Sequence, residues 1–150
     1  PTVGVAVRTL GAAGAVQITA SHNPSPWNGL KMFGSDGAVL SAEAGALVRG
    51  LYESGDFKRA AWNGQGSVSV PPGMLEEHAR KVLDQVSVAA VAGRGFKVFV
   101  DANGGAGGPL AEALLGELGC EVVAHNCDPT GDFAHDPEPT PAHLAGVAPW

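Results

Sequence analysis

Short stretches of alternating apolar residues are separated along this chain by longer stretches in which apolar residues recur every three or four positions. The first pattern predicts strands, because successive side chains of a strand point to opposite faces of a sheet. The second predicts helices, because residues three and four apart share one helix face. On this basis we expect strands at 15–20, 30–34, 97–100 and 121–124.

The first eleven residues fit both patterns. Alternate valines are typical of a strand, whereas a second apolar set has helical spacing: Val3, Ala6, Val7 and Leu10. We favour a helix, because the glycines at 11 and 14 would end it there.

After the strand at 30–34, Ser35, Asp36 and Gly37 predict a turn, consistent with a hairpin into residues 38–40. Ser41 is then the expected N-cap of a helix that Gly55 ends. The apolar stripe of this helix consists of Ala44, Leu47, Val48, Leu51 and Tyr52.

A connecting segment rich in glycine, serine and proline follows at 55–73. The next helix presents one apolar face, made of Leu75, Ala79, Val82, Leu83 and Val86. Beyond the strand at 97–100 and the glycine run at 104–108, Pro109 opens a helix and Gly119 stops it, before the strand at 121–124. That order predicts two parallel strands joined by a helix. Residues 126–141 should be a loop, with Thr140 a candidate cap for a last helix.

The expected fold class is α/β, with mixed or parallel sheet units and flanking helices. We expect two units, at 1–87 and 88–150, and neither has enough elements to be a complete domain. The chain begins at Pro1, with neither methionine nor a signal-peptide pattern, so we interpret it as a piece of a longer chain.

Composition excludes several classes of protein. The 150 residues are 45% hydrophobic and 16% charged, with a net charge of −6 and nine scattered Lys and Arg. An acidic chain without a basic cluster is not expected to bind nucleic acid. The sequence has no apolar run near the ~20 residues that span a bilayer, so no membrane partner is expected. Two cysteines predict reduced thiols in a cytoplasmic protein.

The candidate chemistry lies after the first predicted strand. Residues 18–24 read Ile-Thr-Ala-Ser-His-Asn-Pro, and residues 28–31 read Asn-Gly-Leu-Lys. The loop thus combines a serine hydroxyl, an imidazole, two carboxamides and a nearby ammonium. Pro24 restricts its own φ and pushes Asn23 toward extended conformations, which stiffens the loop. Such a loop can present one serine to a charged reacting centre.

The serine motif and its follow-on resemble the phosphoserine loop of the α-D-phosphohexomutases, which move phosphate between the 1 and 6 positions of hexose phosphates. Further segments are similar to these mutases: Pro1-Thr2, the Val-Asp-Ala-Asn-Gly-Gly-Ala-Gly stretch at 100–107, and the Pro-rich stretches at 128–133 and 135–141. The resemblance implies a multi-domain enzyme of four α/β domains. Residues 1–87 would be the C-terminal half of domain I, and 88–150 the N-terminal part of domain II.

The same resemblance assigns roles. Ser21 would carry the phosphoryl group, and Lys31 would be the active-site lysine that offsets developing charge. His22 is a candidate acid or base, or a phosphate contact, with a loop-orienting role equally open. Asn23 and Asn28 are candidates for phosphate or substrate binding, although each is also suited to shaping the loop. Mg²⁺ would bind through the phosphate on Ser21, its other ligands coming from a loop that this sequence lacks.

The implied partners are a phosphorylated hexose, a hexose 1,6-bisphosphate activator and the rest of a mutase chain. The form around Trp27 and Asn28 is closest to the phosphoglucosamine and phosphomannose branches of the family. Phosphoglucosamine is the first expected substrate, with phosphomannose or phosphoglucose second. The sugar-recognition loop of the family is absent.

Two other functions stay open, a non-catalytic sugar-phosphate or nucleotide-binding module and an inactive fragment. The glycine run at 104–108 lacks both G-x-G-x-x-G and P-loop spacing. The cysteines and histidines after residue 119 lack paired zinc-ligand spacing. We interpret Asp101 as fixing a loop, and the Pro-Glu-Pro at 137–139 as a stiff structural segment.

Overall fold

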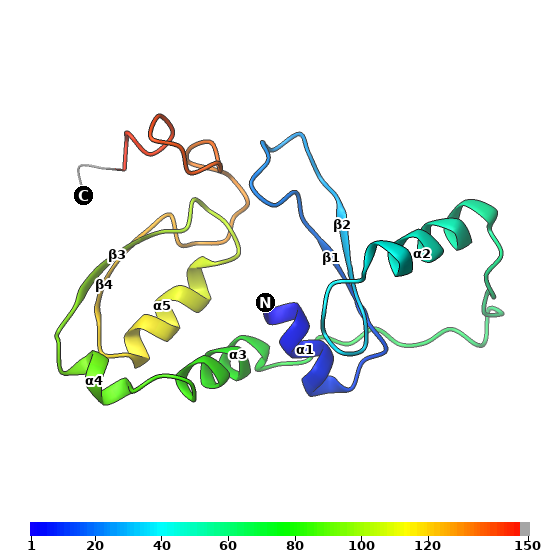
Figure 1. The fold of residues 1–150 in the computed structure, drawn as a ribbon, viewed down its shortest axis with the longest axis horizontal. Coiled ribbons are helices and arrows are strands. Elements are labelled where there is room, and N and C mark those ends of the chain that lie inside the picture. The colour runs from blue at the N-terminus through cyan, green and yellow to red at the C-terminus, as the bar shows by residue number, and fades with distance from the viewer. Residues whose placement is uncertain (148–150) are drawn as a thin grey trace. The chain divides into compact units, whose positions relative to one another are not determined.

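The computed structural model describes residues 1–147, which form two compact units (Figure 1). One unit comprises Pro1–Gln17 and Leu30–Met74, and the other comprises Ile18–Gly29 and the described residues from Leu75 onward. The serine loop therefore belongs to the second unit. The predicted change of domain after residue 87 stays a prediction.

Helix α1 (Thr2–Leu10) opens the first unit and confirms the helical interpretation of this stretch. Gly11 follows it in the left-handed conformation, at φ 60°, where glycine carries no Cβ penalty. The helix packs on the turn before residue 38. A Cβ on Gly4 or on Gly37 would collide with the backbone carbonyl of the other, so both positions require glycine.

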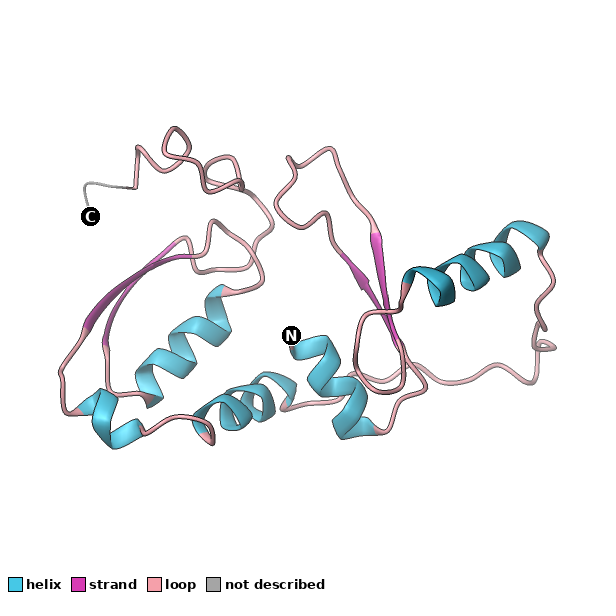
Figure 2. Ribbon diagram, viewed as in Figure 1, coloured by secondary structure: helices cyan, strands magenta, loops and turns pink. Residues whose placement is uncertain are grey.

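Strands β1 (Ala15–Ile18) and β2 (Leu30–Phe33) form a two-stranded sheet, at the predicted places but slightly shorter than predicted (Figure 2). The predicted hairpin is present as a single antiparallel bridge between Phe33 and Val39. Two apolar side chains of β1 lie outward, with Val16 58% and Ile18 71% exposed. The alternation predicted the strands correctly, but within residues 1–147 no layer buries this face.

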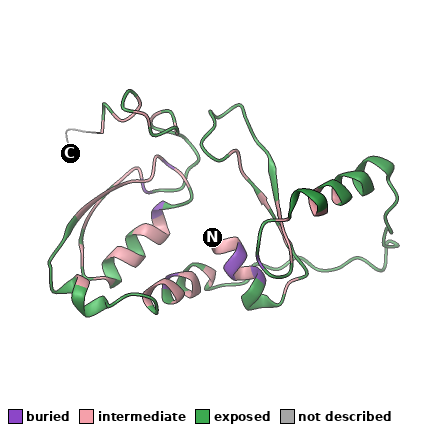
Figure 3. Ribbon diagram, in the orientation of Figure 1, coloured by how far each residue is buried: buried purple, intermediate pink, exposed green. Residues whose placement is uncertain are grey.

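Helix α2 (Ala42–Ser54) has the predicted ends. The Ser41 Oγ accepts a hydrogen bond from the Ala44 amide at 3.2 Å, and Gly55 ends the helix at φ 68°. No residue of the helix is buried, and most of the helix is exposed, as Figure 3 shows. Leu47, Leu51 and Tyr52 of its apolar stripe are exposed, whereas Ala44 and Val48 are half-buried. Amphipathic spacing therefore identified the helix, but the described residues cover only part of its stripe.

The second unit contains helices α3 (Met74–Leu83), α4 (Val88–Ala92) and α5 (Gly108–Glu117), with strands β3 (Lys97–Asp101) and β4 (Glu121–His125). The two strands pair in parallel, from Lys97 opposite Glu121 to Asp101 opposite His125. This confirms the predicted β–α–β order, with α5 packed on both strands. Helix α4 was not predicted, because five residues are too few to show a period.

The glycine run before α5 is explained by close packing. A Cβ on Gly108 would collide with the backbone of Cys127, and one on Gly104, at φ 69°, with the carbonyl of Asp132. Both glycines are buried, and they let the loop between β3 and α5 lie directly against the chain that follows β4.

The chain after Thr140 forms hydrogen-bonded turns over the described residues 141–147, where a helix was predicted. The Thr140 Oγ1 does accept a bond from the His143 amide at 3.3 Å, as a cap would. Across residues 1–147, none of the helices has the length and apolar character needed to cross a membrane.

Candidate functional site

The serine loop is held in shape by its own hydrogen bonds. The Thr19 amide donates to the Gly29 carbonyl at 2.9 Å, which closes the base of the loop. The Ser21 amide donates to the Thr19 Oγ1 at 3.0 Å, and the Asn23 Nδ2 donates to the Ala20 carbonyl at 2.9 Å. These local bonds replace the strand pairing that ends at β1 and β2, so the loop is fixed although all of residues 21–29 are exposed.

Ser21 occupies the left-handed region of backbone space, at φ 59°. A residue with a Cβ rarely adopts this conformation, which costs of order 1–3 kcal/mol and tends to occur at functional sites. Here the sharp turn after Ala20 places the hydroxyl on the outside of the loop. The strained conformation of Ser21 thus lowers the stability of the loop while it exposes the serine side chain.

His22 connects Ser21 to a distant segment of the same unit. Its Nδ1 lies 3.2 Å from the Ser21 Oγ, and its Nε2 lies 3.1 Å from the Glu138 Oε2. Hydroxyl, imidazole and carboxylate therefore form a continuous hydrogen-bonded series. Both side chains of the His22–Glu138 contact are partly open to solvent, at 61% for His22 and 49% for Glu138.

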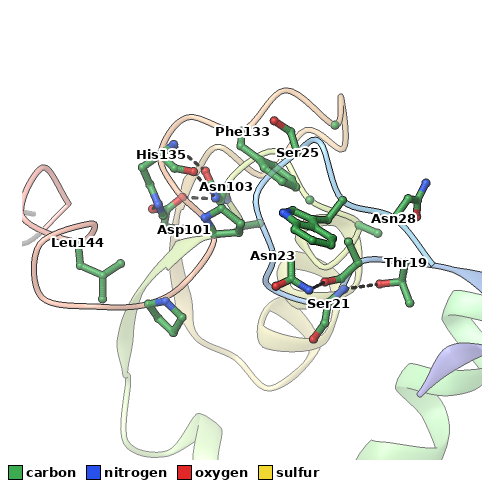
Figure 4. A pocket seen from close by; sticks show the side chains of 18 of the residues that line it. Thr19, Ser21, Asn23, Ser25, Asn28, Asp101, Asn103, Phe133, His135 and Leu144 are labelled. Atoms are coloured by element: carbon green, nitrogen blue, oxygen red, sulfur yellow. Dashed lines mark hydrogen bonds and ion pairs between the residues drawn. The ribbon is translucent and has the colours of Figure 1, made fainter. Parts of the chain in front are cut away.

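A pocket of about 790 Å³ opens beside the loop (Figure 4). Ser21, Asn23 and Asn28 line it from the serine loop, and Asp101 and Asn103 line it from the end of β3. Its apolar walls are aromatic and aliphatic side chains: Ile18, Trp27, Phe99, Phe133 and Leu144. All lining residues belong to the second unit.

Asp101 anchors the far wall of this pocket, as predicted for a loop-fixing carboxylate. Its Oδ1 accepts bonds from the Asn103 amide at 2.9 Å and from the Asn126 Nδ2 at 3.0 Å, and its Oδ2 lies 2.8 Å from the His135 Nε2. Burial opposes ionisation of the carboxyl, but the hydrogen bonds from Asn126 and His135 outweigh it and lower the pKa of Asp101 below its ordinary value.

His135 uses both ring nitrogens as donors. Its Nδ1 lies 2.9 Å from the Asp136 carbonyl, and its Nε2 faces the Asp101 carboxylate. The bond to the Asp136 carbonyl and then the bond to Asp101 raise the pKa of His135 above its ordinary value, although burial opposes this. An imidazolium satisfies both contacts at once. Asn103 adds a reciprocal pair of bonds to the His135 backbone.

Four of the five predicted site residues lie on the serine loop. Ser21, Asn23 and Asn28 line the pocket, and His22 lies next to Ser21. The Asn28 Oδ1 accepts a bond from the Gly29 amide at 2.9 Å. Lys31 lies on β2 in the first unit, where it is exposed and lines a different hollow together with Arg49. All five roles stay predictions.

Sequence reasoning did not foresee the partner of His22 or the partner of Asp101. Glu138 and His135 are separated from these residues by more than 100 and more than 30 positions, respectively. A single sequence contains no pairing rule over such distances. The one available hint was the stiffness of the Pro-Glu-Pro segment, which presents a single acid.

The described residues do not make a metal site by themselves. Within 1–147, no three His, Cys, Asp or Glu side chains come close enough together to hold a metal ion. Glu138 beside His22 and Asp101 beside His135 are both engaged by imidazole rings instead.

Two family models match this chain. Residues 1–59 match "Phosphoglucomutase/phosphomannomutase, alpha/beta/alpha domain I", and residues 76–148 match "alpha/beta/alpha domain II" of the same family. Together they account for most of the sequence, and they confirm the expected α/β class.

Curated relatives of this chain bear names from the same family. A protein named "Probable phosphoglucosamine mutase" from Methanothermobacter thermautotrophicus is 38% identical over 97% of this chain, and 31% of that protein is covered. A phosphoglucomutase/phosphomannomutase from Thermococcus kodakarensis is also 38% identical, over 97% of this chain and 32% of its own length. The chain therefore spans about a third of the length of these relatives.

The crystal structure of a candidate phosphomannomutase from Thermus thermophilus resembles this chain with a TM-score of 0.82 at 26% identity. The match covers 98% of this chain and 33% of that one.

Proposed function

Because the chain belongs to the phosphoglucomutase/phosphomannomutase family, we propose that it works as part of a phosphohexomutase that interconverts hexose 1-phosphates and 6-phosphates. Relatives that align with nearly all of this chain are about three times longer, which supports a larger enzyme in which other segments complete the site. Phosphoglucosamine is the favoured substrate, since relatives of that name recur among the matches.

The presentation of Ser21 is the observation that carries this proposal. The serine has a strained backbone, an exposed side chain and a hydrogen-bonded imidazole, and it lines a pocket that is large enough for a sugar phosphate. A serine that only shaped a turn would have no need of the histidine. These features support a phosphoserine that exchanges its phosphoryl group with the sugar.

In the first half of the reaction, the bond between phosphorus and the Ser21 Oγ breaks while a bond to a sugar hydroxyl oxygen forms. The departing Oγ takes a proton from the His22 Nδ1, and the sugar hydroxyl gives its proton to a base outside the described residues. The resulting 1,6-bisphosphate then reorients in the site, so that its other phosphate faces Ser21. Ser21 then attacks the other phosphate and returns its proton to the same nitrogen of His22, while the bond between that phosphorus and the sugar oxygen breaks. The released sugar oxygen takes back the proton held by the external base.

A phosphoserine carries nearly two negative charges, which suits a divalent cation. We propose that Mg²⁺ binds through the Ser21 phosphate and takes its other ligands from elsewhere in the larger enzyme, because the described residues contain no cluster that could hold the ion. Asn23 and Asn28 are proposed to contact the substrate or its phosphate. Their amides line the pocket even though each also bonds to the loop.

Phosphopeptide mass spectrometry tests the proposal. The full-length enzyme is incubated with hexose 1,6-bisphosphates, desalted and digested, and the peptide with residues 18–31 is sequenced. We expect one phosphate, on Ser21. The absence of phosphate from this peptide, or its presence on Ser25, would contradict the proposal.

A further inference from the structure

In the hydrogen-bonded series Ser21–His22–Glu138, the two ring nitrogens of His22 face different partners, Ser21 and Glu138. This difference bears on which nitrogen exchanges a proton with the serine. Resting on the function proposed above, we infer that Glu138 is a positioning residue, which fixes His22 so that its Nδ1 alone exchanges a proton with Ser21.

The imidazole of His22 makes two contacts. The Nε2 faces a carboxylate oxygen at 3.1 Å, and an ionised carboxylate can only accept hydrogen bonds. The Nε2 therefore carries a proton in both the neutral and the charged ring. The Nδ1, 3.2 Å from the Ser21 Oγ, is then the nitrogen that gains and loses one. Without the carboxylate, a neutral ring is free to place its single proton on either nitrogen.

The position of Glu138 is set by a stiff support. Pro137 and Pro139 flank it and restrict the backbone on both sides. Its carbonyl accepts bonds from the Thr140 amide at 2.7 Å and from the His143 Nδ1 at 2.8 Å. Three residues earlier, His135 is tied to Asp101 at the end of β3. The carboxylate is thus held relative to the parallel sheet.

Exposure of the pair argues for a geometric role. Ion pairs between solvent-exposed side chains contribute little to folding. The two side chains of such a pair also separate easily unless the backbone on each side holds them close together. Here both backbones are held, on one side by the Pro-Glu-Pro segment and on the other by the closed serine loop, so the contact orients the ring even though it adds little stability.

Two readouts test this role in the full-length enzyme. The first is ¹⁵N NMR of selectively labelled histidine, with His22 assigned from a His22→Gln variant. In the parent, neutral His22 should be the tautomer protonated at Nε2, and Glu138→Ala should mix the two tautomers. The second is steady-state kinetics. Glu138→Ala and Glu138→Gln should lower kcat by about 10- to 100-fold, by analogy with the partners that orient metal-bound histidines, and leave KM near the parent value.

Asp136→Asn is the matched control, because its carboxylate lies two residues away and faces His143 at 3.4 Å. It should retain the parent tautomer and the parent kcat. An unchanged tautomer in Glu138→Ala would overturn the inference, as would equal loss of kcat in the Asp136 and Glu138 variants. The tautomer measurement needs no turnover, so it separates failure of this inference from failure of the proposed mutase activity, which the Ser21 phosphopeptide reports.

Discussion

The His135 Nε2 lies 2.8 Å from the Asp101 Oδ2, and the side chains are 20% and 9% exposed. This contact joins the carboxyl end of β3 to the Pro-rich segment 34 residues later. Because the same segment presents Glu138 to His22, this contact helps to hold Glu138 in place.

The Asp101–His135 pair predicts a pH-dependent local stability. Because the pKa of His135 is raised in the folded protein, the stability that His135 contributes is fully present below its ordinary pKa of 6.5. This stability is lost as the pH rises through the pKa of His135 in the folded protein. The lowered pKa of Asp101 means that its contribution is present above 3.8 and is lost as pH falls through the folded value. Stability from this contact should therefore be greatest between these two ordinary values.

The measurement is hydrogen exchange of the β3 amides in the full-length enzyme. At about pH 5.5, His135→Gln should reduce protection by an amount equal to roughly 1.5–3 kcal/mol, as for a hydrogen bond to a charged group. At about pH 8.5 the difference from the parent should shrink, because the parent has then lost the same contribution. His143→Gln, whose partner Asp136 is 61% exposed, should show less change between the two conditions. A similar effect of both substitutions at both pH values would refute the prediction.

Removing the Ser21 hydroxyl should abolish turnover without disturbing the fold. Ser21→Ala loses the phosphoryl acceptor, while the exposed hydroxyl contributes little to stability. Ser25→Ala is the matched control, since Ser25 lines the same pocket from the same loop. A coupled mutase assay and circular dichroism compare the two. Residual activity above background in Ser21→Ala would rule out the phosphoserine mechanism.

Lys31 should matter for catalysis if β2 presents it to the complete site. Lys31→Ala should then lower kcat by about 10²-fold, as for other lost electrostatic stabilisers. Lys31→Arg should recover only part of this, because the guanidinium is larger and spreads its charge differently. Lys97→Ala is the control: it removes an exposed ion pair with Glu121 and should leave kcat at the parent value. Parent-like kinetics in both Lys31 variants would make this lysine a surface residue.

Helix α5 offers a pair of glycines with opposite expected effects. Gly108→Ala should destabilise the protein by roughly 1–3 kcal/mol, because the new methyl group has no room beside the Cys127 backbone. Gly116→Ala, with nothing within 4 Å of its Cβ position, should stabilise the helix by up to about 1 kcal/mol. Thermal unfolding of both variants tests the sign. Equal melting temperatures would contradict the close packing at Gly108.

Local structure was predictable wherever one residue imposes a strong local preference. Ser41 and Gly55 bracket α2 as predicted, because a side-chain cap and a left-handed glycine act within a single turn. The strained serine was not predictable, since nothing in the residues of the loop requires a left-handed Ser21. The alternation of apolar and polar residues predicted the position of β1 correctly. It did not predict that Val16 and Ile18 are exposed, because burial depends on which elements pack against that face of the strand.

The sequence by itself determined most of the helices and strands, the glycine-dependent turns and the family resemblance of the serine loop, because these depend on neighbours along the chain. The tertiary structure alone decided that His22 faces Glu138 and that Asp101 faces His135. Asp101 lies where β3 ends at one edge of the parallel sheet, and the chain after β4 returns over that edge to bring His135 and Glu138 there. His22 comes instead from the loop after β1, which belongs to the other two-stranded sheet. Distances across such an edge depend on the packing of α5 and on the backbone contacts of Gly104 and Gly108, which no local pattern specifies.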